Sequence, residues 1–259
     1  MQHSSQQQPT LLVGAEMAIP QGWWPLAVAM ANKLESLALP SECRIEKIFR
    51  ADQHMHVFIN SECLSDVSRE LHERVCKIIS SYCHRARHAC MVCGQKGQTF
   101  FVTDLWGVYC GSHQPAEALD LHAEFADITL ERLNSKGLRA QFPMLPGLEL
   151  RAGWLPLIQR LMLKLTAAGV TSKHYRVLQV KEKFANLAFY IYSTDPDFKR
   201  QQLVYALIDA AQTRSTSMCE ICGQPAKLWI HAGWWTTVCN EHVPDGAKTP
   251  ADYFQKSTL

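Results

Sequence analysis

Apolar residues recur every three or four positions in four stretches of the chain, which predicts four amphipathic helices. The first helix of each half has its apolar positions at Leu26, Met30, Leu34 and Leu37, and at Leu157, Ile158, Leu161, Met162 and Leu165. The second helix has them at Val67, Leu71, Val75, Ile78, Ile79 and Tyr82, and at Phe198, Val204, Leu207, Ile208 and Ala211. Candidate N-caps of these second helices are Ser65 or Asp66, and Asp195 or Asp197.

Between the two helices of each half, apolar and polar residues alternate, and this period of two predicts a β-hairpin. In the second half, the strands cover residues 176–182 and 187–192, with a turn around Ala185 and Asn186. In the first half, they cover 44–49 and 55–60. We expect one face of each sheet to be apolar.

Three motifs occur twice in the same order. Residues 22–26 (GWWPL) return as 153–157 (GWLPL), 90–95 (CMVCGQ) as 219–224 (CEICGQ), and 110–113 (CGSH) as 239–242 (CNEH). The offsets are 131, 129 and 129 residues. Such regular self-similarity indicates an internal duplication.

Each repeat contains four potential metal ligands with the spacing C-x2-C-x16-C-x2-H. They are Cys90, Cys93, Cys110 and His113 in the first repeat, and Cys219, Cys222, Cys239 and His242 in the second. Thiolates and imidazole suit zinc, and four protein ligands leave no position for a catalytic water. We predict two structural zinc ions per chain. Iron and metal-free buried thiols are the weaker alternatives.

The insert between the ligand pairs contains two strand-like runs, at 99–102 and 107–109 in the first repeat and at 227–230 and 235–238 in the second. A hairpin there would bring the second ligand pair back to the first, as in a zinc ribbon. We therefore predict an α+β protein of two tandem modules, each made of helix, β-hairpin, helix and zinc ribbon. The two modules are expected to pack with pseudo-two-fold symmetry.

The predicted boundaries are an N-terminal tail at 1–21, module 1 at 22–113, a helical linker at 114–152, module 2 at 153–243 and a C-terminal tail at 244–259. Within the linker, the apolar residues of 117–138 predict a helix. The two prolines of 142–147 predict an extended segment after it.

The composition fits a globular protein, with 47% hydrophobic and 19% charged residues. The first ten residues lack the basic and apolar parts of a secretion signal. Ten cysteines without such a signal favour metal binding in a reducing cytoplasm. With six thiolates and two zinc ions, the formal charge of +2 falls to zero, which gives no overall attraction for nucleic acid.

Other residues have two interpretations. His84, Arg85, Arg87 and His88 would either contact nucleic-acid phosphates or simply place cations at a helix C-terminus. Cys43, Cys63, Cys76 and Cys83 are expected to be ordinary thiols. Five tryptophans are expected to pack in the core or between the modules, and any exposed cluster would be a candidate anchor for a protein partner. They are Trp23, Trp24, Trp154, Trp234 and Trp235.

The second repeat resembles short, uncharacterised zinc-ribbon proteins of bacteriophages and other bacterial mobile elements. These have one copy each of G-W-x-P-L-I, V-K-E-K-F-G-x-L-R-F-Y, C-x2-C-G and C-x2-H. Here the corresponding segments are 153–158, 180–190, 219–223 and 239–242. This chain departs from the pattern with Ala185 in place of Gly and Ala188 in place of Arg. The first repeat keeps the helix start and the ligands but not the hairpin motif.

The sequence contains no nucleophile elbow, phosphate loop or dinucleotide fingerprint. We therefore expect a non-enzymatic, cytoplasmic adaptor of a phage or mobile element that acts through protein–protein contact, for example on a host defence system. The defence role follows only from the resemblance. The alternatives are a nucleic-acid-binding zinc-ribbon protein and an enzyme with a site between the modules. The chain is expected to be a monomer with an internal pseudo-dimer, or a homo-oligomer.

Overall fold

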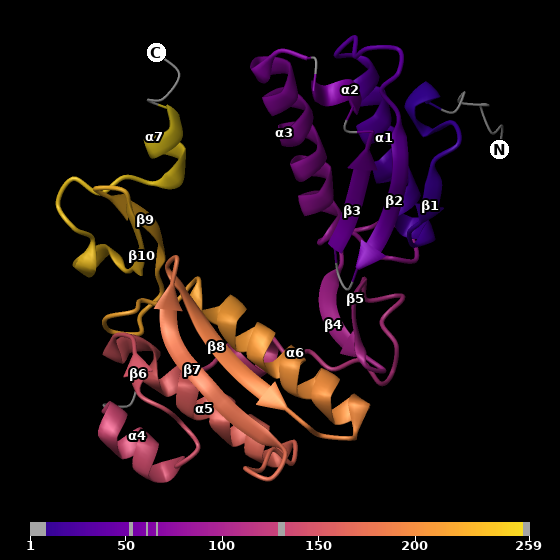
Figure 1. Ribbon diagram of the computed structural model, residues 1–259. Helices are drawn as coiled ribbons and strands as arrows, with labels where there is room; N and C mark the ends of the chain where they lie inside the picture. Colours follow the sequence, from indigo (N-terminus) through magenta and orange to yellow (C-terminus); the bar gives the residue numbers. More distant parts are fainter. Residues whose placement is uncertain (1–8, 52–53, 61, 66, 129–132, 256–259) are drawn as a thin grey trace. The chain divides into compact units, whose positions relative to one another are not determined.

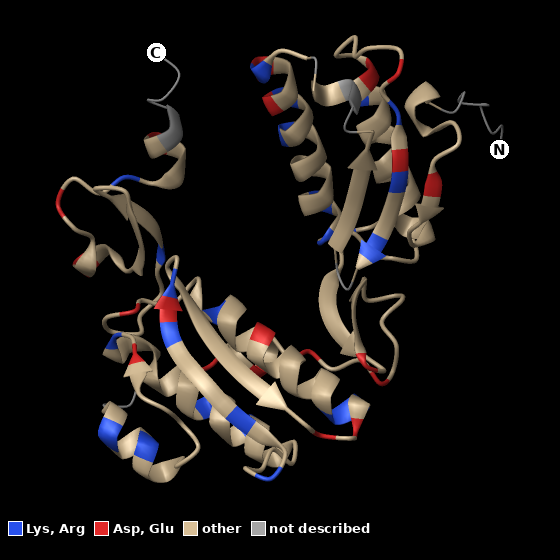
Figure 2. Cartoon of the chain, in the orientation of Figure 1, with Lys and Arg blue, Asp and Glu red and all other residues tan. Residues whose placement is uncertain are grey.

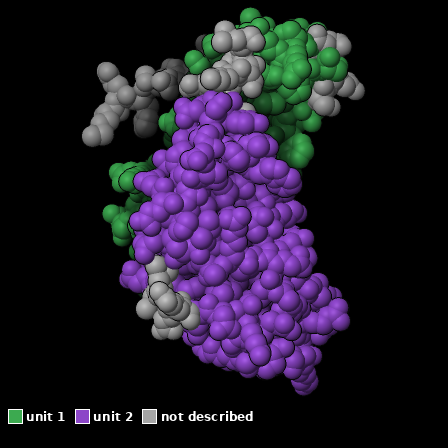
Figure 3. All heavy atoms as spheres, turned by 90° about the vertical axis from the view of Figure 1, so that its left-hand side faces the viewer, with its two compact units in different colours: residues 1–119 green, residues 120–259 purple. Residues whose placement is uncertain are grey.

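The computed structural model describes residues 9–51, 54–60, 62–65, 67–128 and 133–255. The chain divides into two compact units, unit 1 (Met1–Leu119) and unit 2 (Asp120–Leu259) (Figure 3). Both units mix helices with small sheets, which confirms the α+β class. Among the described residues, no helix has both the length and the apolar character needed to cross a membrane.

Unit 1 is built on a three-stranded sheet and a separate two-stranded ribbon (Figure 1). The sheet contains β1 (Glu16–Ala18), β2 (Ile45–Ala51) and β3 (His54–Ile59), and the ribbon contains β4 (Gln98–Val102) and β5 (Leu105–Tyr109). The helices are η1 (Thr10–Leu12), η2 (Gln21–Trp23), α1 (Trp24–Glu35), α2 (Glu62–Ser65) and α3 (Arg69–Ala86). β2 runs parallel to β1 and antiparallel to β3. Side chains of α1, α3 and the sheet share one apolar core.

Residues 10–21, directly before the first repeat motif, belong to the fold of unit 1 and are not part of a tail. Leu11 and Leu12 are buried in the core. Met17 in β1 lies opposite Ile48 in the neighbouring strand. The tail boundary predicted at residue 21 is therefore corrected, because residues 10–21 contribute a short helix, a strand and the first residue of η2. A strand of three residues is too short to produce a recognisable alternation.

Unit 2 also contains a short strand, a helix, two strands, a long helix and two strands in that order, together with further short helices (Figure 1). Its strands are β6 (Leu148–Glu149), β7 (Tyr175–Lys183), β8 (Asn186–Ser193), β9 (Lys227–His231) and β10 (Trp234–Val238). Its helices are η3 (Ala123–Phe125), α4 (Ser135–Gln141), η4 (Ala152–Trp154), α5 (Leu155–Ala167), α6 (Phe198–Ser215), η5 (Asn240–His242) and α7 (Pro250–Gln255). β7 is parallel to β6 and antiparallel to β8. Figure 2 shows acidic and basic residues interspersed along α3 and β7.

The helix predicted over residues 117–138 does not form over the described residues 117–128, and residues 135–138 belong to the separate helix α4. A turn at Asp120, whose side chain accepts the N–H of Ala123, leads into η3. Residues 129–132 lie outside the described residues. α4 begins after Asn134, whose side chain accepts the N–H of Gly137 and caps the helix. Local side-chain bonds of this kind compete with continuous helix.

The helices and hairpins predicted from apolar spacing are present, with small shifts at their ends. In unit 2, Leu187 and Phe189 face the core, while Tyr190 and Tyr192 face outward. Asp197 caps α6 as predicted. In unit 1 the N-cap of α3 is Ser68, which corrects the prediction of Ser65 or Asp66. Ser68 precedes the helix directly, which places its hydroxyl within reach of the Leu71 N–H.

A buried ion pair fixes the open end of the β7–β8 hairpin to the start of α6. Arg200 donates two hydrogen bonds to Asp195, of 2.5 and 2.7 Å. The hydroxyl of Tyr175 donates to the same carboxylate at 2.7 Å. The bidentate guanidinium holds the pKa of Asp195 well below its usual range. Burial, together with the hydrogen bond to Asp195, raises the pKa of Tyr175.

Candidate metal centres

The four predicted ligands of unit 1 lie together, with one donor atom of each within 4.8 Å of the others. The Sγ atoms of Cys93 and Cys110 are 3.7 Å apart. His113 Nδ1 lies 3.2 Å from Cys110 Sγ and 3.8 Å from Cys90 Sγ. Cys90 and Cys110 are buried, whereas Cys93 is exposed.

Unit 2 has the same arrangement. Cys222 Sγ and Cys239 Sγ are 3.7 Å apart. His242 Nδ1 lies 3.2 Å from Cys239 Sγ and 3.7 Å from Cys219 Sγ. The C-x2-C pair of each unit comes from a turn after the long helix, and the C-x2-H pair follows the second ribbon strand. The hairpins predicted between the ligand pairs are the antiparallel pairs β4–β5 and β9–β10.

The spacing of these donor atoms fits a tetrahedral ion. Zinc–sulfur bonds of about 2.3 Å in a tetrahedron place two sulfurs about 3.8 Å apart, and a sulfur and an imidazole nitrogen slightly closer. The observed sulfur–sulfur distance of 3.7 Å agrees with this, and the sulfur–nitrogen distances lie between 3.2 and 3.8 Å. Three thiolates and one imidazole are a suitable donor set for zinc. Both groups can therefore bind a metal ion.

Backbone N–H groups lower the pKa of the first cysteine in each group. Burial raises the pKa of Cys90, but N–H groups of Cys93, Cys110 and Val92 lower it to about 6. In unit 2, the same competition lowers the pKa of Cys219 to about 7. Donors aimed at a sulfur favour the thiolate, which is the form that binds metal.

The second cysteine has the opposite shift, because neighbouring sulfurs compete for negative charge. Burial and the sulfurs of Cys219 and Cys239 raise the pKa of Cys222 to about 11. A divalent cation removes this repulsion, because it neutralises the thiolates it binds. Three thiolates at these distances are therefore favoured only when a cation is bound.

The Gly-Trp motif at the start of each first helix holds the cysteine turn in place. In unit 2, the N–H of Gly153 donates to Glu220 O at 2.9 Å, and Trp154 Nε1 donates to Met218 O at 2.8 Å. In unit 1, Gly22 donates to Met91 O at 2.9 Å, and Trp23 Nε1 donates to Ala89 O at 2.9 Å. A Cβ on either glycine would lie 2.1–2.2 Å from the carbonyl oxygen of the first cysteine ligand.

Each unit needs two glycines at this contact. Gly22 and Gly153 are required because a Cβ would meet the cysteine turn. Gly94 and Gly223 have φ values of 76° and 81°, so the cysteine turn uses the left-handed conformation expected from the sequence. Sequence reasoning identified the Gly-Trp repeat but treated the tryptophans as general packing. The signal for the contact was that the Gly-Trp motif is repeated together with the cysteines, although it lies far from them in sequence.

The ribbon of unit 2 is also fixed to the tip of the β7–β8 hairpin. The buried hydroxyl of Thr237 donates to Ala185 O at 2.8 Å, and the N–H of Ala185 donates to Glu182 Oε1 at 2.6 Å. Phe184 and Ala185 occupy the left-handed region, with φ values of 51° and 63°. Ala185 is buried, whereas Phe184 is 72% exposed. The hairpin tip therefore presents an exposed aromatic ring from a tightly held turn.

The predicted nucleic-acid contacts lie at the C-terminal end of α3. The rings of His84 and His88 are 5.2 Å apart, and the Arg85 guanidinium lies over the ring of Tyr82. Arg87 contacts the imidazole of His54 on β3. The basic helix end is thus continuous with one edge of the hairpin in unit 1.

The remaining cysteines differ from one another. Cys76 and Cys83 are free thiols, and burial raises the pKa of Cys83. Cys43 is disulfide-bonded, so the prediction of an ordinary thiol is wrong at this position. The side chain of Cys63 lies outside the described residues. None of these positions belongs to the two metal groups.

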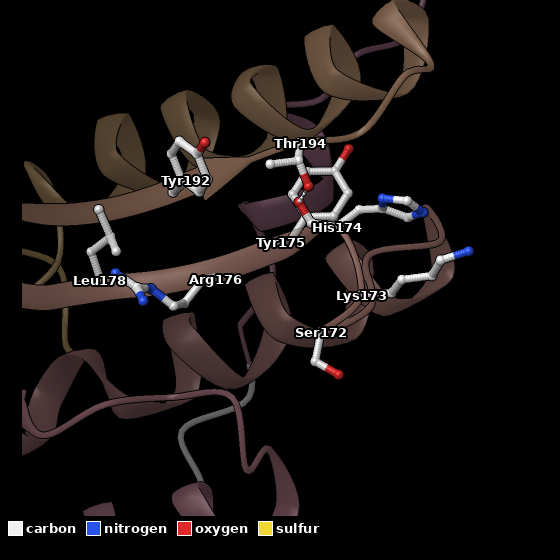
Figure 4. Close-up of a pocket in the computed structure, with 8 residues that line it drawn as sticks. All are labelled: Ser172, Lys173, His174, Tyr175, Arg176, Leu178, Tyr192 and Thr194. Carbon is white, nitrogen blue, oxygen red and sulfur yellow. Dashed lines mark hydrogen bonds between the residues drawn. The ribbon is translucent and has the colours of Figure 1, made fainter.

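A hollow of about 370 Å³ lies at the open end of the β7–β8 hairpin, and none of the candidate metal ligands lines it (Figure 4). It is lined by Ser172, Lys173, His174, Tyr175, Arg176, Leu178, Tyr192 and Thr194. Figure 4 shows that Ser172 and Lys173 extend away from Tyr192, so the side chains do not converge on one point. The Tyr175 hydroxyl is engaged by Asp195.

Comparison of the chain with protein-family models, curated proteins and solved structures gives no match. The functional argument therefore depends on the geometry of this chain.

Proposed function

We propose that the chain is a non-enzymatic, zinc-stabilised binding protein of two tandem modules that acts by contact with a protein partner. The observation that carries the proposal is the link between each Cys3His group and the first helix of its unit. Gly153 and Trp154 hold the cysteine turn in unit 2, and Gly22 and Trp23 hold it in unit 1. A metal ion in such a position holds a small fold together.

The metal proposed for both groups is zinc. Four protein donors complete the tetrahedral coordination that zinc adopts in structural sites, and an activated water would need one of those positions. Bound zinc would supply the charge that the three thiolates require. The chain's own contribution is to orient the ligands through the Gly-Trp contacts and the backbone N–H groups that point at Cys90 and Cys219.

The tandem arrangement is supported by residues outside the motifs that first indicated it. The parallel pairs β1–β2 and β6–β7 place Met17 opposite Ile48 and Leu148 opposite Val180. Isolated bridges extend both ribbons at the same offset of 129 residues, between Phe101 and Leu119 and between Ile230 and Lys248. Pseudo-two-fold packing of the modules is part of this proposal.

Exposed aromatic rings on unit 2 favour a protein partner. Phe184 is 72% exposed, Trp234 is 81% exposed and Trp235 is 44% exposed. Large aromatic side chains are typical anchors of protein interfaces. The zinc-loaded chain, immobilised and exposed to bacterial lysate, should capture one protein in stoichiometric amount. That protein should bind again as a purified component. Repeated capture without such a protein would contradict the proposal.

The second candidate function is nucleic-acid binding, and the contact between Arg87 and His54 favours it. This contact extends the basic helix end toward the rings of Phe49 and His56, which stack at 5.2 Å on the outer face of the sheet. Cations beside exposed rings suit a single strand. Changing Arg85 and Arg87 to Ala together should weaken a gel shift at low salt. Absence of any shift there would exclude this candidate.

A phage or mobile-element origin, with a host defence system as the target, is also part of the proposal. It rests on the sequence resemblance of the second repeat. Identification of the captured protein by mass spectrometry would test it, because a partner from a defence system is expected.

A further inference from the structure

A second hollow in unit 2, of about 560 Å³, adjoins the metal group. Its walls come from the segment before α5, from the end of β7 and from β10, and His242 lines it. The charged residues in its wall are Glu149, Glu182, Glu220 and Arg151. Trp234 and Trp235 complete the aromatic side of the wall. This hollow therefore combines carboxylates, exposed indole rings and one of the candidate metal ligands.

Glu220 is the buried carboxylate of this hollow, with its side chain only 7% exposed. Its Oε1 accepts the Thr236 hydroxyl at 2.6 Å and lies 3.5 Å from Arg151 NH1. Among the described residues, all hydrogen bonds and ion pairs of this carboxylate end on Oε1. Oε2 is therefore free to accept, and it reaches solvent, because Trp229 Nε1 is the only buried unpartnered polar side-chain atom among the described residues.

Two further carboxylates add negative charge. Glu182 Oε1 accepts the N–H of Ala185, and Glu149 accepts the neutral side chain of Gln179. Neither bond supplies a positive charge. The wall contains three carboxylates and a single guanidinium, that of Arg151. A Cys3His group with bound zinc would add one more negative charge at His242. The hollow has the electrostatic character of a cation site.

The indole rings suit the same kind of ligand. Trp234 is 81% exposed and Trp235 is 44% exposed, although both are large apolar side chains. A ring face attracts ammonium and guanidinium groups, and the indole ring does so most strongly. A lysine or arginine side chain has a charged head and an aliphatic stem. The carboxylates suit the head and the indole rings suit the stem, so the hollow favours a long basic side chain.

We propose that this hollow binds a lysine or arginine side chain from an extended basic segment of a protein partner. This inference rests on the proposed function, because it names the contact site and the chemistry of the partner. Carboxylate oxygens of Glu182 and Glu220 receive the N–H groups, and the Trp234 and Trp235 rings cover the stem.

Unit 1 supplies a natural comparison, since it lacks the acidic residue and one of the two tryptophans at the corresponding positions. By the 129-residue offset, Met91 stands where unit 2 has Glu220, and Leu105 where it has Trp234. Leu105 is 52% exposed, so it is an accessible apolar residue at the matching ribbon turn. Leu105→Ala is therefore the matched control for Trp234→Ala.

The test uses the full, zinc-loaded chain labelled with 15N. Four nine-residue Gly-Ser peptides with a central arginine, lysine, citrulline or glutamate are titrated while the indole N–H signals are followed by NMR. The signals of Trp234 and Trp235 should shift and saturate with the arginine and lysine peptides. Citrulline keeps the shape of arginine without its charge and should bind at least about tenfold more weakly. Equal binding of arginine and citrulline would overturn the proposal.

Variants locate the site. Glu182→Gln retains an acceptor for the Ala185 N–H and removes only the charge, so it should weaken arginine binding about fivefold. Trp234→Ala should weaken it about tenfold. Leu105→Ala, and Glu46→Gln at an exposed position of β2, should leave it unchanged. Zinc content is measured for each variant, so a loss of binding with two ions still bound is a local effect. Unchanged affinity in Glu182→Gln and Trp234→Ala would contradict this site.

The same variants separate this inference from the proposed function. If the wild type and the Leu105→Ala, Glu182→Gln and Trp234→Ala variants all retain one protein partner equally, the adaptor function stands and the hollow is not the contact site. If none of them retains a protein partner, the adaptor function itself fails.

Discussion

The indole N–H of Trp154 donates a 2.8 Å hydrogen bond to the backbone carbonyl of Met218, the residue directly before the first cysteine ligand of unit 2. Both residues are completely buried. Trp23 makes the equivalent bond to Ala89 in unit 1. The start of the first helix is therefore hydrogen-bonded to the cysteine turn of the same unit. The bonded residues are 64 positions apart in sequence in unit 2 and 66 in unit 1.

Removal of this hydrogen bond should destabilise unit 2. Trp154→Phe keeps most of the ring but leaves the buried Met218 carbonyl without its donor, which should lower the free energy of unfolding by about 2 kcal/mol. Urea unfolding in saturating zinc measures the difference. Trp234→Phe, at an exposed position, is the control and should change stability by less than about 0.5 kcal/mol. Equal stability of the two variants would contradict the role given to Trp154.

A methyl group on Gly153 should disrupt one metal group. Its Cβ would lie 2.2 Å from Cys219 O, an approach that real structures do not allow, so the turn must move. Gly153→Ala should therefore retain one zinc ion per chain instead of two, as measured by native mass spectrometry. Gly147→Ala is the matched control, because nothing lies within 4 Å of its Cβ position. Retention of two ions by Gly153→Ala would show that the turn can yield.

The two metal groups should load independently. Cys93→Ser and Cys222→Ser each replace one thiolate, and each variant should lose one zinc ion while the other site stays filled. The double variant should bind none with structural affinity. Elemental analysis after removal of free metal measures this. Cys76→Ser, at an exposed free thiol of α3, is the control and should retain two ions. Iron in place of zinc in the purified protein would correct the metal assignment.

Stability at high pH should depend on Tyr175. Burial and its hydrogen bond to Asp195 raise the pKa of this phenol in the folded protein, so the folded state holds its proton longer than the unfolded state does. The stabilisation is complete below the unfolded pKa of about 10 and decreases as the pH rises through the folded pKa. Wild type should therefore lose unfolding free energy above about pH 10, and Tyr175→Phe should lose less. Urea unfolding at pH 8 and pH 11 measures this difference. An identical decrease in both proteins would contradict the assignment.

Local patterns in the sequence determined the ligands and most of the elements. A C-x2-C pair lies within one turn, and a C-x2-H pair within another, so their spacing alone identifies two ligand pairs. The runs at 99–102 and 227–230 then predicted the ribbons, because alternation is a property of neighbouring residues. The helices of each unit followed in the same way from apolar positions three or four residues apart.

Only the tertiary structure decided how distant segments join. β1 and β6 have three and two residues, which is too few for a periodic signal, and each is recognised as a strand through its pairing with β2 or β7. The hydrogen bond from Trp154 to Met218 and the hollow beside Glu220 likewise depend on residues brought together from separate parts of the chain. Sequence spacing specifies contacts within a turn of chain, whereas these contacts are set by the packing of one element on another.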